Sequence, residues 1–178
     1  MKKRGVCSKN IFLDNLFLFL FQMGKESNME VQILKKEDLQ RCAVLFFDVY
    51  SKPPWNERWK SVEQTERYLK ELIENPLFEG YIVCEKEILL AVCIGHRKTW
   101  IEGTEFIIDE FFVDSKQQGK KIGSYFMNYI KEEANKKNYY CIGLSTMRNF
   151  PAQSFYEKHG FQLENEIIFM TNCVSKFT

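Results

Sequence analysis

The sequence is poor in histidine and has no excess of charge of either sign. Only two histidines occur among 178 residues, His96 and His159, which disfavours a histidine-based metal centre or a Ser-His-Asp triad. Lysine and arginine number 25 against 24 aspartate and glutamate, so no general basic surface indicates nucleic acid as a partner. We therefore expect a protein that uses no metal or redox cofactor and binds no nucleic acid.

Paired cysteines are also missing. The six cysteines are scattered and form no CxxC pair, and most of them lie in apolar or mixed stretches. This pattern argues against a disulfide framework or a zinc site and indicates reduced, mostly buried thiols in a cytoplasmic protein. The positions are Cys7, Cys42, Cys84, Cys93, Cys141 and Cys173.

No apolar run is long enough to cross a bilayer. The run IFLDNLFLFLF near the start has about half the length that a spanning helix needs, so we expect no membrane partner. A basic start precedes this run as in a secretory signal, but no small-residue cleavage site follows. Residues 1–28 are either a short docked hydrophobic helix or an extension upstream of a native start at Met29. We favour the extension, because Lys25-Glu26 can be encoded by a bacterial ribosome-binding sequence just upstream of Met29.

From Met29 to Thr178 the periodicity predicts one domain of the α/β (α+β) class. Antiparallel strands come first and a strand-helix-strand crossover later, which predicts a mixed central sheet of about six to seven strands flanked by about four helices on both faces. Predicted strands are 31–34, 80–84, 88–95, 106–113, 140–146 and 166–173, and predicted helices are 36–50, 61–74, one that starts near residue 119, and 152–159.

One stretch combines a strand, a glycine-containing loop and a helix. FIIDEFFV is rich in β-branched and aromatic residues, and QQGKKIGS follows it at the start of an amphipathic pattern. Backbone N–H groups at a helix start, with lysines beside them, suit an anion such as a pyrophosphate. The pattern alone leaves open whether the glycines serve an anion or only allow the helix to pack closely.

Together with NFPAQSFYEKHGF further on, these motifs resemble the GNAT family of N-acetyltransferases, which transfer an acetyl group from acetyl-CoA to an amine. The resemblance covers Met29 to the end of the chain and implies the GNAT fold, with acetyl-CoA as cosubstrate. Within the family, the motifs look most like those of polyamine or diamine acetyltransferases and of aminoglycoside 6′-N-acetyltransferases.

The resemblance also implies which residues contact acetyl-CoA. The loop is similar to the family's pattern Q/R-x-x-G-x-G/A, in which Gln118 leads and Gly123 is last. Lys121 stands where the middle glycine is usual, and its N–H can donate if the position is helical. The second motif places Asn149 at the pantetheine arm. The implied cofactor-binding residues are Phe112, Val113, Gln118, Gly119, Lys120, Lys121, Ile122, Gly123, Ser124, Asn149, Ala152 and Phe155.

Acetyl transfer needs a route for the proton of the amine, because an alkylamine is mostly protonated at neutral pH. Asp109 and Glu110 are candidate acceptors, and at least one of them is expected to be an ordinary solvated or paired residue. Successive strand residues alternate, so we expect only one of the two to reach a given side. The resemblance places Tyr156 near the sulfur as the acid for the thiolate, unless it only packs its helix, and assigns the oxyanion to a backbone N–H near Val113.

The loop Ser51 to Lys60 carries two tryptophans, Trp55 and Trp59. They either anchor the loop to the core or contribute cation–π contacts to a cationic substrate, beside Asp109 and Glu110.

The leading hypothesis from these motifs is an acetyl-CoA-dependent N-acetyltransferase for the primary amine of a small molecule, a polyamine or an aminoglycoside. The alternatives are a protein or peptide N-acetyltransferase and a non-catalytic CoA-binding module. Members of the family often pair through edge strands or C-terminal strands, so the resemblance implies a possible homodimer.

Overall fold

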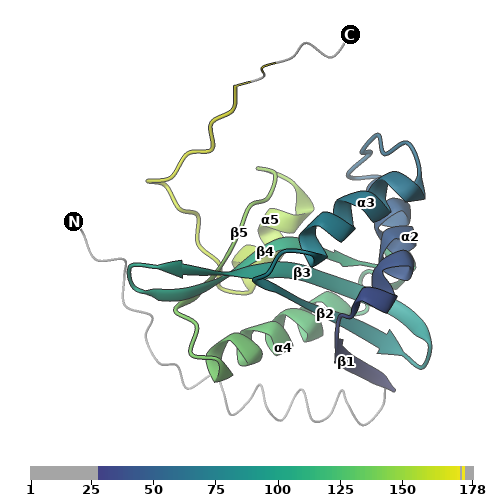
Figure 1. The fold of residues 1–178 in the computed structure, drawn as a ribbon, viewed down its shortest axis with the longest axis horizontal. Helices are drawn as coiled ribbons and strands as arrows, with labels where there is room; N and C mark the ends of the chain where they lie inside the picture. Colours follow the sequence, from purple (N-terminus) through teal and green to yellow (C-terminus); the bar gives the residue numbers. More distant parts are fainter. Residues whose placement is uncertain (1–27, 173, 175–178) are drawn as a thin grey trace. The chain divides into compact units, whose positions relative to one another are not determined.

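The computed structural model describes residues 28–172 and 174, so the interpretation of the N-terminal extension falls outside the described part. The chain forms two compact units, one up to Ser145 and one from Thr146. In Figure 1 the first unit contains β1 (Met29–Ile33), a 3-10 turn (Lys36–Asp38), α2 (Leu39–Tyr50), α3 (Val62–Ile73), β2 (Phe78–Glu85), β3 (Ile88–Trp100), β4 (Gly103–Val113), a second 3-10 turn (Ser115–Gln117), α4 (Ile122–Lys136) and β5 (Cys141–Leu144). The second unit contains α5 (Pro151–Lys158).

The five strands form one mixed sheet in the order β1-β2-β3-β4-β5. The first four strands are antiparallel neighbours, and β5 returns parallel to β4 after the crossover through α4. The mixed sheet and its chain order are confirmed. The number of strands among the described residues is five, lower than the six to seven expected.

Helices cover both faces of the sheet, as the sequence predicts (Figure 1). On one face, α2 and α3 share a buried cluster with alternate residues of the strands, among them Ile82, Val92 and Ile94. On the other face α4 packs its aromatic side chains, with Phe126 stacked on Phe111 at a centroid distance of 5.4 Å. The sheet is therefore the middle layer, and its central strands are buried from both sides.

Several helix boundaries follow from local chemistry. Ser61 caps α3, because its side-chain oxygen accepts the backbone N–H of Gln64 at 3.3 Å. Pro151 stands in the first turn of α5, where a missing N–H costs nothing, and Gly160 has a φ of 84° just beyond the helix end. These ends agree with the prediction.

The predicted last strand at 166–173 is wrong over its described part, since residues 166–172 form no strand, and Cys173 lies outside the described residues. The segment is apolar, yet Ile168 is 75% and Phe169 92% exposed. A strand needs a neighbouring strand for its backbone hydrogen bonds, and the β-propensity of the segment alone does not supply one.

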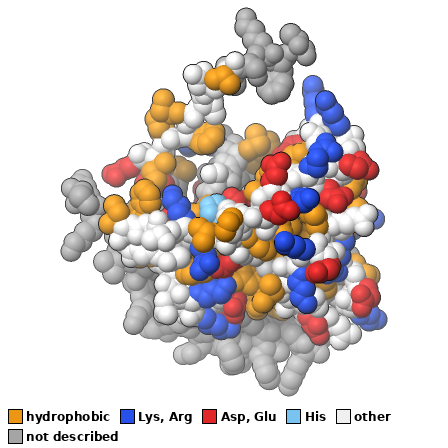
Figure 2. All heavy atoms as spheres, viewed as in Figure 1, with side chains coloured by type: hydrophobic (Ala, Val, Ile, Leu, Met, Phe, Trp, Pro, Cys, Tyr) orange, Lys and Arg blue, Asp and Glu red, His pale blue; other side chains and the backbone are white. Residues whose placement is uncertain are grey.

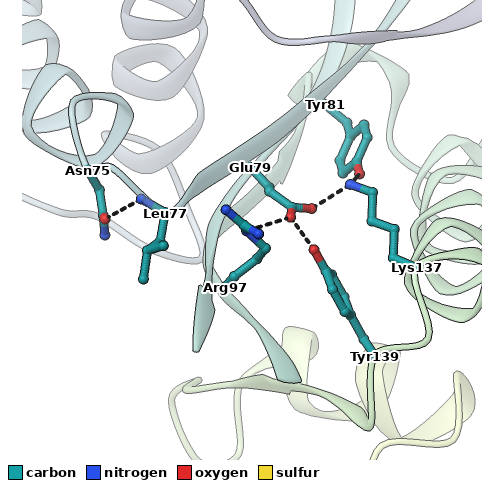
Figure 3. A network of polar contacts seen from close by, with 7 residues as sticks. All are labelled: Asn75, Leu77, Glu79, Tyr81, Arg97, Lys137 and Tyr139. Atoms are coloured by element: carbon teal, nitrogen blue, oxygen red, sulfur yellow. Dashed lines mark hydrogen bonds and ion pairs between the residues drawn. The ribbon is translucent and has the colours of Figure 1, made fainter. Parts of the chain in front are cut away.

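A network of charged and phenolic side chains ties the end of α4 to β2 and β3 (Figure 3). Glu79 accepts a hydrogen bond from the Lys137 ammonium at 2.6 Å and one from the Tyr139 hydroxyl, and Arg97 Nε lies 3.3 Å from the same carboxylate. Lys137 also donates to the hydroxyl of Tyr81 at 2.8 Å. Because the Glu79 side chain is only 14% exposed, these cations offset the cost of holding its charge inside.

The surface of the protein reflects the balanced charge of its composition. Figure 2 shows basic and acidic side chains interspersed over α2 and α3. The thiols of Cys42, Cys84 and Cys93 are free and buried, as expected. Between residues 28 and 172, no helix has the length and apolarity to span a membrane. The same residues contain no cluster of three or more His, Cys, Asp or Glu side chains that could hold a metal ion.

Candidate active site

A β-bulge interrupts the pairing of β3 with β4 at Asp109. Ile94 pairs with Glu110 and Gly95 pairs with Ile108, so Asp109 is an extra residue on β4. A Cβ atom at Gly95 would lie 2.3 Å from a backbone carbonyl oxygen of β4, so this close approach requires glycine. A bulge bends its strand and re-aims the side chains next to it.

The bulge turns both carboxylates towards the face of the sheet that carries α2 and α3. Ile94 belongs to the core cluster on that face, and Glu110 is its cross-strand partner. His96 lies two residues beyond Ile94 and therefore points to the same face. Its Nδ1 atom is 2.8 Å from Oδ2 of Asp109, which places this second carboxylate there as well. The expectation that only one carboxylate reaches a given side is therefore wrong, because the extra residue breaks the alternation.

Two tyrosines hold the Glu110 carboxylate. The hydroxyl of Tyr50, at the end of α2, donates to Oε2 at 2.8 Å. The hydroxyl of Tyr68, from the middle of α3, donates to Oε1 at 2.6 Å. Each carboxylate oxygen thus receives one phenolic hydrogen bond, and two helices fix its direction.

Burial raises the pKa of Glu110 to about 7, well above its ordinary value of 4.5. The hydrogen bonds from Tyr68 and Tyr50 lower this pKa, and the nearby charges of Glu57 and Asp109 raise it again. The pKa of Tyr68 is raised, by burial first and by Glu110 next, so its hydroxyl keeps its proton and remains a donor. Glu110 therefore exchanges a proton near neutral pH, as a general base requires.

Asp109 has a different environment. It is exposed, and its side chain keeps 25% of its accessible surface while it pairs with His96, at 27%. An exposed carboxylate is suited to attract a cation. The two acidic residues that the sequence left equivalent are thus distinguished by burial and by their partners.

The tryptophans of the loop that follows α2 pack against the core and against the two tyrosines. Trp55 contacts Tyr50 and Trp59 contacts Tyr68, at ring-centroid distances of 5.4 Å and 5.3 Å. The indole N–H of Trp59 donates to Glu57 at 2.7 Å. Both indoles are partly buried against the core cluster, so the anchoring role is observed and contact with a substrate stays a prediction.

Strand β4 extends beyond the end of β5. The β4–β5 ladder ends at the pair Ile108–Leu144, whereas β4 continues to Val113 in pairing with β3. In the described chain, no β5 residue pairs with the end of β4 that carries Phe112 and Val113. The family resemblance places the oxyanion N–H in this part of β4, and that role remains a prediction.

The loop between β4 and α4 departs from the sequence prediction at two points. The helix begins at Ile122 and not near Gly119, and Lys121 is its N-cap with a left-handed φ of 64°. The condition under which the Lys121 N–H is expected to donate, a helical position, is therefore not met. The loop needs a left-handed turn there, which a glycine adopts readily and this lysine adopts at some cost.

The start of α4 nevertheless suits an anion. The first turn contains no acidic side chain, and the N–H groups of Ile122, Gly123 and Ser124 have no acceptor within the helix. Gly119 also has a positive φ of 80°, and a Cβ atom there would meet nothing within 4 Å. Binding of acetyl-CoA by Gln118, Gly119, Lys120, Lys121, Ile122, Gly123 and Ser124 stays a prediction with this geometry in its favour.

The residues of the second motif lie in the second unit. Asn149 has a left-handed φ of 65°, and its backbone N–H donates to Gln153 at 2.8 Å just before α5 begins. Ala152, Phe155 and Tyr156 are on α5 itself, where the Tyr156 ring contacts Phe155 at a centroid distance of 5.3 Å. The roles of these four residues towards acetyl-CoA remain predictions.

Sequence reasoning missed four residues of the site: Tyr50, Tyr68, Glu57 and His96. The two tyrosines fall on the apolar stripes of their helices, where they read as ordinary packing residues. A signal existed for the bulge, because an isolated glycine such as Gly95 inside a strand pattern indicates one. Neither Glu57 nor His96 carried a local signal of its own.

The sequence was compared with models of protein families and with curated proteins. Residues 78–163 match the family model described as an acetyltransferase (GNAT) domain. No curated protein is significantly similar to the chain in sequence.

Solved structures show the same fold at low sequence identity. A possible acetyltransferase from Clostridium difficile 630 has a TM-score of 0.71 at 17% identity and covers 83% of this chain and 99% of its own. A predicted acetyltransferase from Clostridium acetobutylicum, solved with acetyl-CoA, has a TM-score of 0.61 at 17% identity over 80% and 96% of the two chains. A ribosomal-protein-alanine N-acetyltransferase from Brucella melitensis has a TM-score of 0.64 at 14% identity over 82% and 99%. Residues 78–163 thus match a GNAT acetyltransferase domain, and this match together with the shared fold supports an N-acetyltransferase that uses acetyl-CoA as its acetyl donor.

Proposed function

We propose that this acetyltransferase modifies the primary amine of a small cationic molecule and that Glu110 accepts the proton of the amine. The observation that carries the proposal is the geometry of Glu110, which two phenols orient on the α2 and α3 face of the sheet. A base with a pKa of about 7 can take up a proton and release it again at neutral pH.

The reaction distributes its protons over this chain's own groups. Glu110 removes a proton from the alkylammonium, directly or through water, and the neutral nitrogen attacks the thioester carbonyl. A backbone N–H near Val113 stabilises the oxyanion. The new C–N bond forms as the C–S bond breaks, and Tyr156 donates its proton to the departing thiolate. The nitrogen loses its second proton through water to the Tyr156 phenolate, and the proton on Glu110 is released to solvent.

The charges of the site support this substrate class. Three carboxylates lie close enough to interact, because the charges of Glu57 and Asp109 both raise the pKa of Glu110. The aromatic rings of Trp59 and Tyr68 lie beside them. Carboxylates next to aromatic faces favour cations, which supports a polyamine or an aminoglycoside over an uncharged amine.

Thiol release from acetyl-CoA, measured with the full chain, tests the proposal. The acceptors are spermidine, linear diamines, an aminoglycoside and a set of N-terminal peptides. We expect release with a polycation, and release with peptides alone would replace the proposal by peptide N-acetylation. Acetyl-CoA binding without release on any acceptor would support the non-catalytic alternative.

A further inference from the structure

We propose that His96 is a positioning residue of the acceptor site. Through its hydrogen bond it holds the Asp109 carboxylate beside Glu110 as the anchor for a second positive charge on the acceptor. The inference rests on the proposed function and assigns the second cationic group of its substrate to Asp109.

His96 lies on the face of the sheet that carries α2 and α3. It pairs with Phe78 of β2 and with Ile107 of β4, and Phe78 packs against the core cluster under α2 and α3. Cross-strand partners share a face, so the imidazole lies on the face that carries Glu110. It therefore contacts Asp109 from within the candidate site.

The contact with His96 orients the Asp109 carboxylate. Asp109 is the extra residue of the bulge, and the regular ladder does not fix the direction of its side chain. The 2.8 Å contact between His96 Nδ1 and Asp109 Oδ2 does fix it. One carboxylate oxygen is engaged by the imidazole, and the other can accept a hydrogen bond from an ammonium group.

The neighbouring cation, Arg97, points away from Asp109. Arg97 follows His96 directly and so faces the opposite side of the sheet, where its Nε lies 3.3 Å from Glu79. Arg97 is thus paired with Glu79 in the network near α4 and does not neutralise Asp109. A second ammonium of a substrate can supply the cation that Asp109 faces.

The two carboxylates then divide the work. Glu110, half-buried and held by neutral phenols, handles the proton of the reacting amine. Asp109, more exposed and held by His96, binds the distant ammonium without reacting. This division predicts a preference for a diamine over the monoamine of the same chain length.

The experiment compares His96→Leu, which removes the donor, with His96→Asn, whose amide nitrogen can replace Nδ1 at the same distance from Cβ. For each variant, kcat and KM are measured with linear diamines and with monoamines of matched length. We expect His96→Leu to reduce the preference for the diamine about tenfold, mainly through KM, as loss of an oriented charge-assisted contact would. His96→Asn should retain most of the preference.

The outcomes separate this inference from the function on which it rests. Equal losses of the diamine and the monoamine in His96→Leu, or His96→Asn as impaired as His96→Leu, would overturn the role of His96 and leave the amine acetyltransferase intact. Failure of the wild-type protein to release thiol with any amine would overturn both proposals. A thermal melt of each variant shows whether it is folded, and a variant that loses its preference with an unchanged melting temperature supports positioning.

Discussion

Two carboxylates of this molecule sit in partly buried positions on opposite faces of the sheet, and their partners differ. Glu79 is held by the cations Lys137 and Arg97 together with the Tyr139 hydroxyl (Figure 3). Glu110 is held by two neutral phenols, Tyr50 and Tyr68. Cationic partners keep a carboxylate ionised and make it an anchor, whereas neutral partners in a buried site leave it able to take up a proton.

The same substitution at the two positions should therefore have opposite consequences. Glu110→Gln removes the proton acceptor and should lower kcat by about 10²- to 10³-fold, the usual contribution of a general base. Steady-state thiol release measures this loss. Glu71→Gln, on the exposed surface of α3, makes the same change of charge and should leave kcat within about twofold, since surface changes are usually neutral. An active Glu110→Gln enzyme would mean that the proton leaves by another route.

Glu79→Gln should act on stability and leave catalysis intact. The substitution removes the ionised acceptor of Lys137 and Arg97, so we expect the free energy of unfolding to fall by about 1–2 kcal/mol. Urea denaturation followed by circular dichroism measures it. A large loss of kcat without a loss of stability would contradict the assignment of Glu79 as an anchor.

Glu110→Gln should instead stabilise the protein at alkaline pH. The pKa of Glu110 is raised in the folded state, so its contribution to stability is complete below pH 4.5 and is lost as the pH rises through about 7. A glutamine avoids this loss, and we expect a gain of about 1 kcal/mol in unfolding free energy at pH 8. The gain should shrink as the pH falls towards 4.5, and denaturation at both pH values measures it.

Removing one of the two phenols that hold Glu110 should have the smallest effect of these changes. The hydroxyl of Tyr68 lowers the pKa of Glu110, so Tyr68→Phe should raise that pKa and move the rising limb of the pH–kcat profile to higher pH by about half a unit to one unit. At neutral pH the rate should fall a few fold. Tyr50→Phe should shift the limb in the same direction. If the rising limb of the pH–kcat profile is unshifted in both variants, the two phenols do not influence catalysis through Glu110.

The sequence was sufficient for the order of elements but not for the choice between the two acids. Periodicity located the helices and most strands, and the motif pointed to the end of β4. The alternation rule then separated Asp109 from Glu110, which is incorrect because the bulge opposite Gly95 adds a residue. Tyr50 and Tyr68 lie 60 and 42 residues from Glu110, so only the packing of α2 and α3 on the sheet brings them to it.

Local propensity failed where the tertiary context decides. Residues 166–172 have the composition of a strand but form none, because a strand also needs a neighbour to pair with. Lys121 carries the left-handed turn that a glycine would usually make, with a φ of 64° at the N-cap of α4. The local amino-acid pattern sets neither the pairing partner of a strand nor the backbone conformation of a loop residue.

The central claim is that Glu110 exchanges its proton near neutral pH. Carbon-13 NMR titration of glutamate carboxyl groups in the wild-type protein, with Glu110→Gln to assign the signal, tests it without any substrate. We predict that the signal missing from the variant titrates with a midpoint of about 7 in the wild type. A midpoint near the ordinary 4.5 would contradict the account, because Glu110 would then be a permanently ionised side chain with little affinity for the proton of an amine.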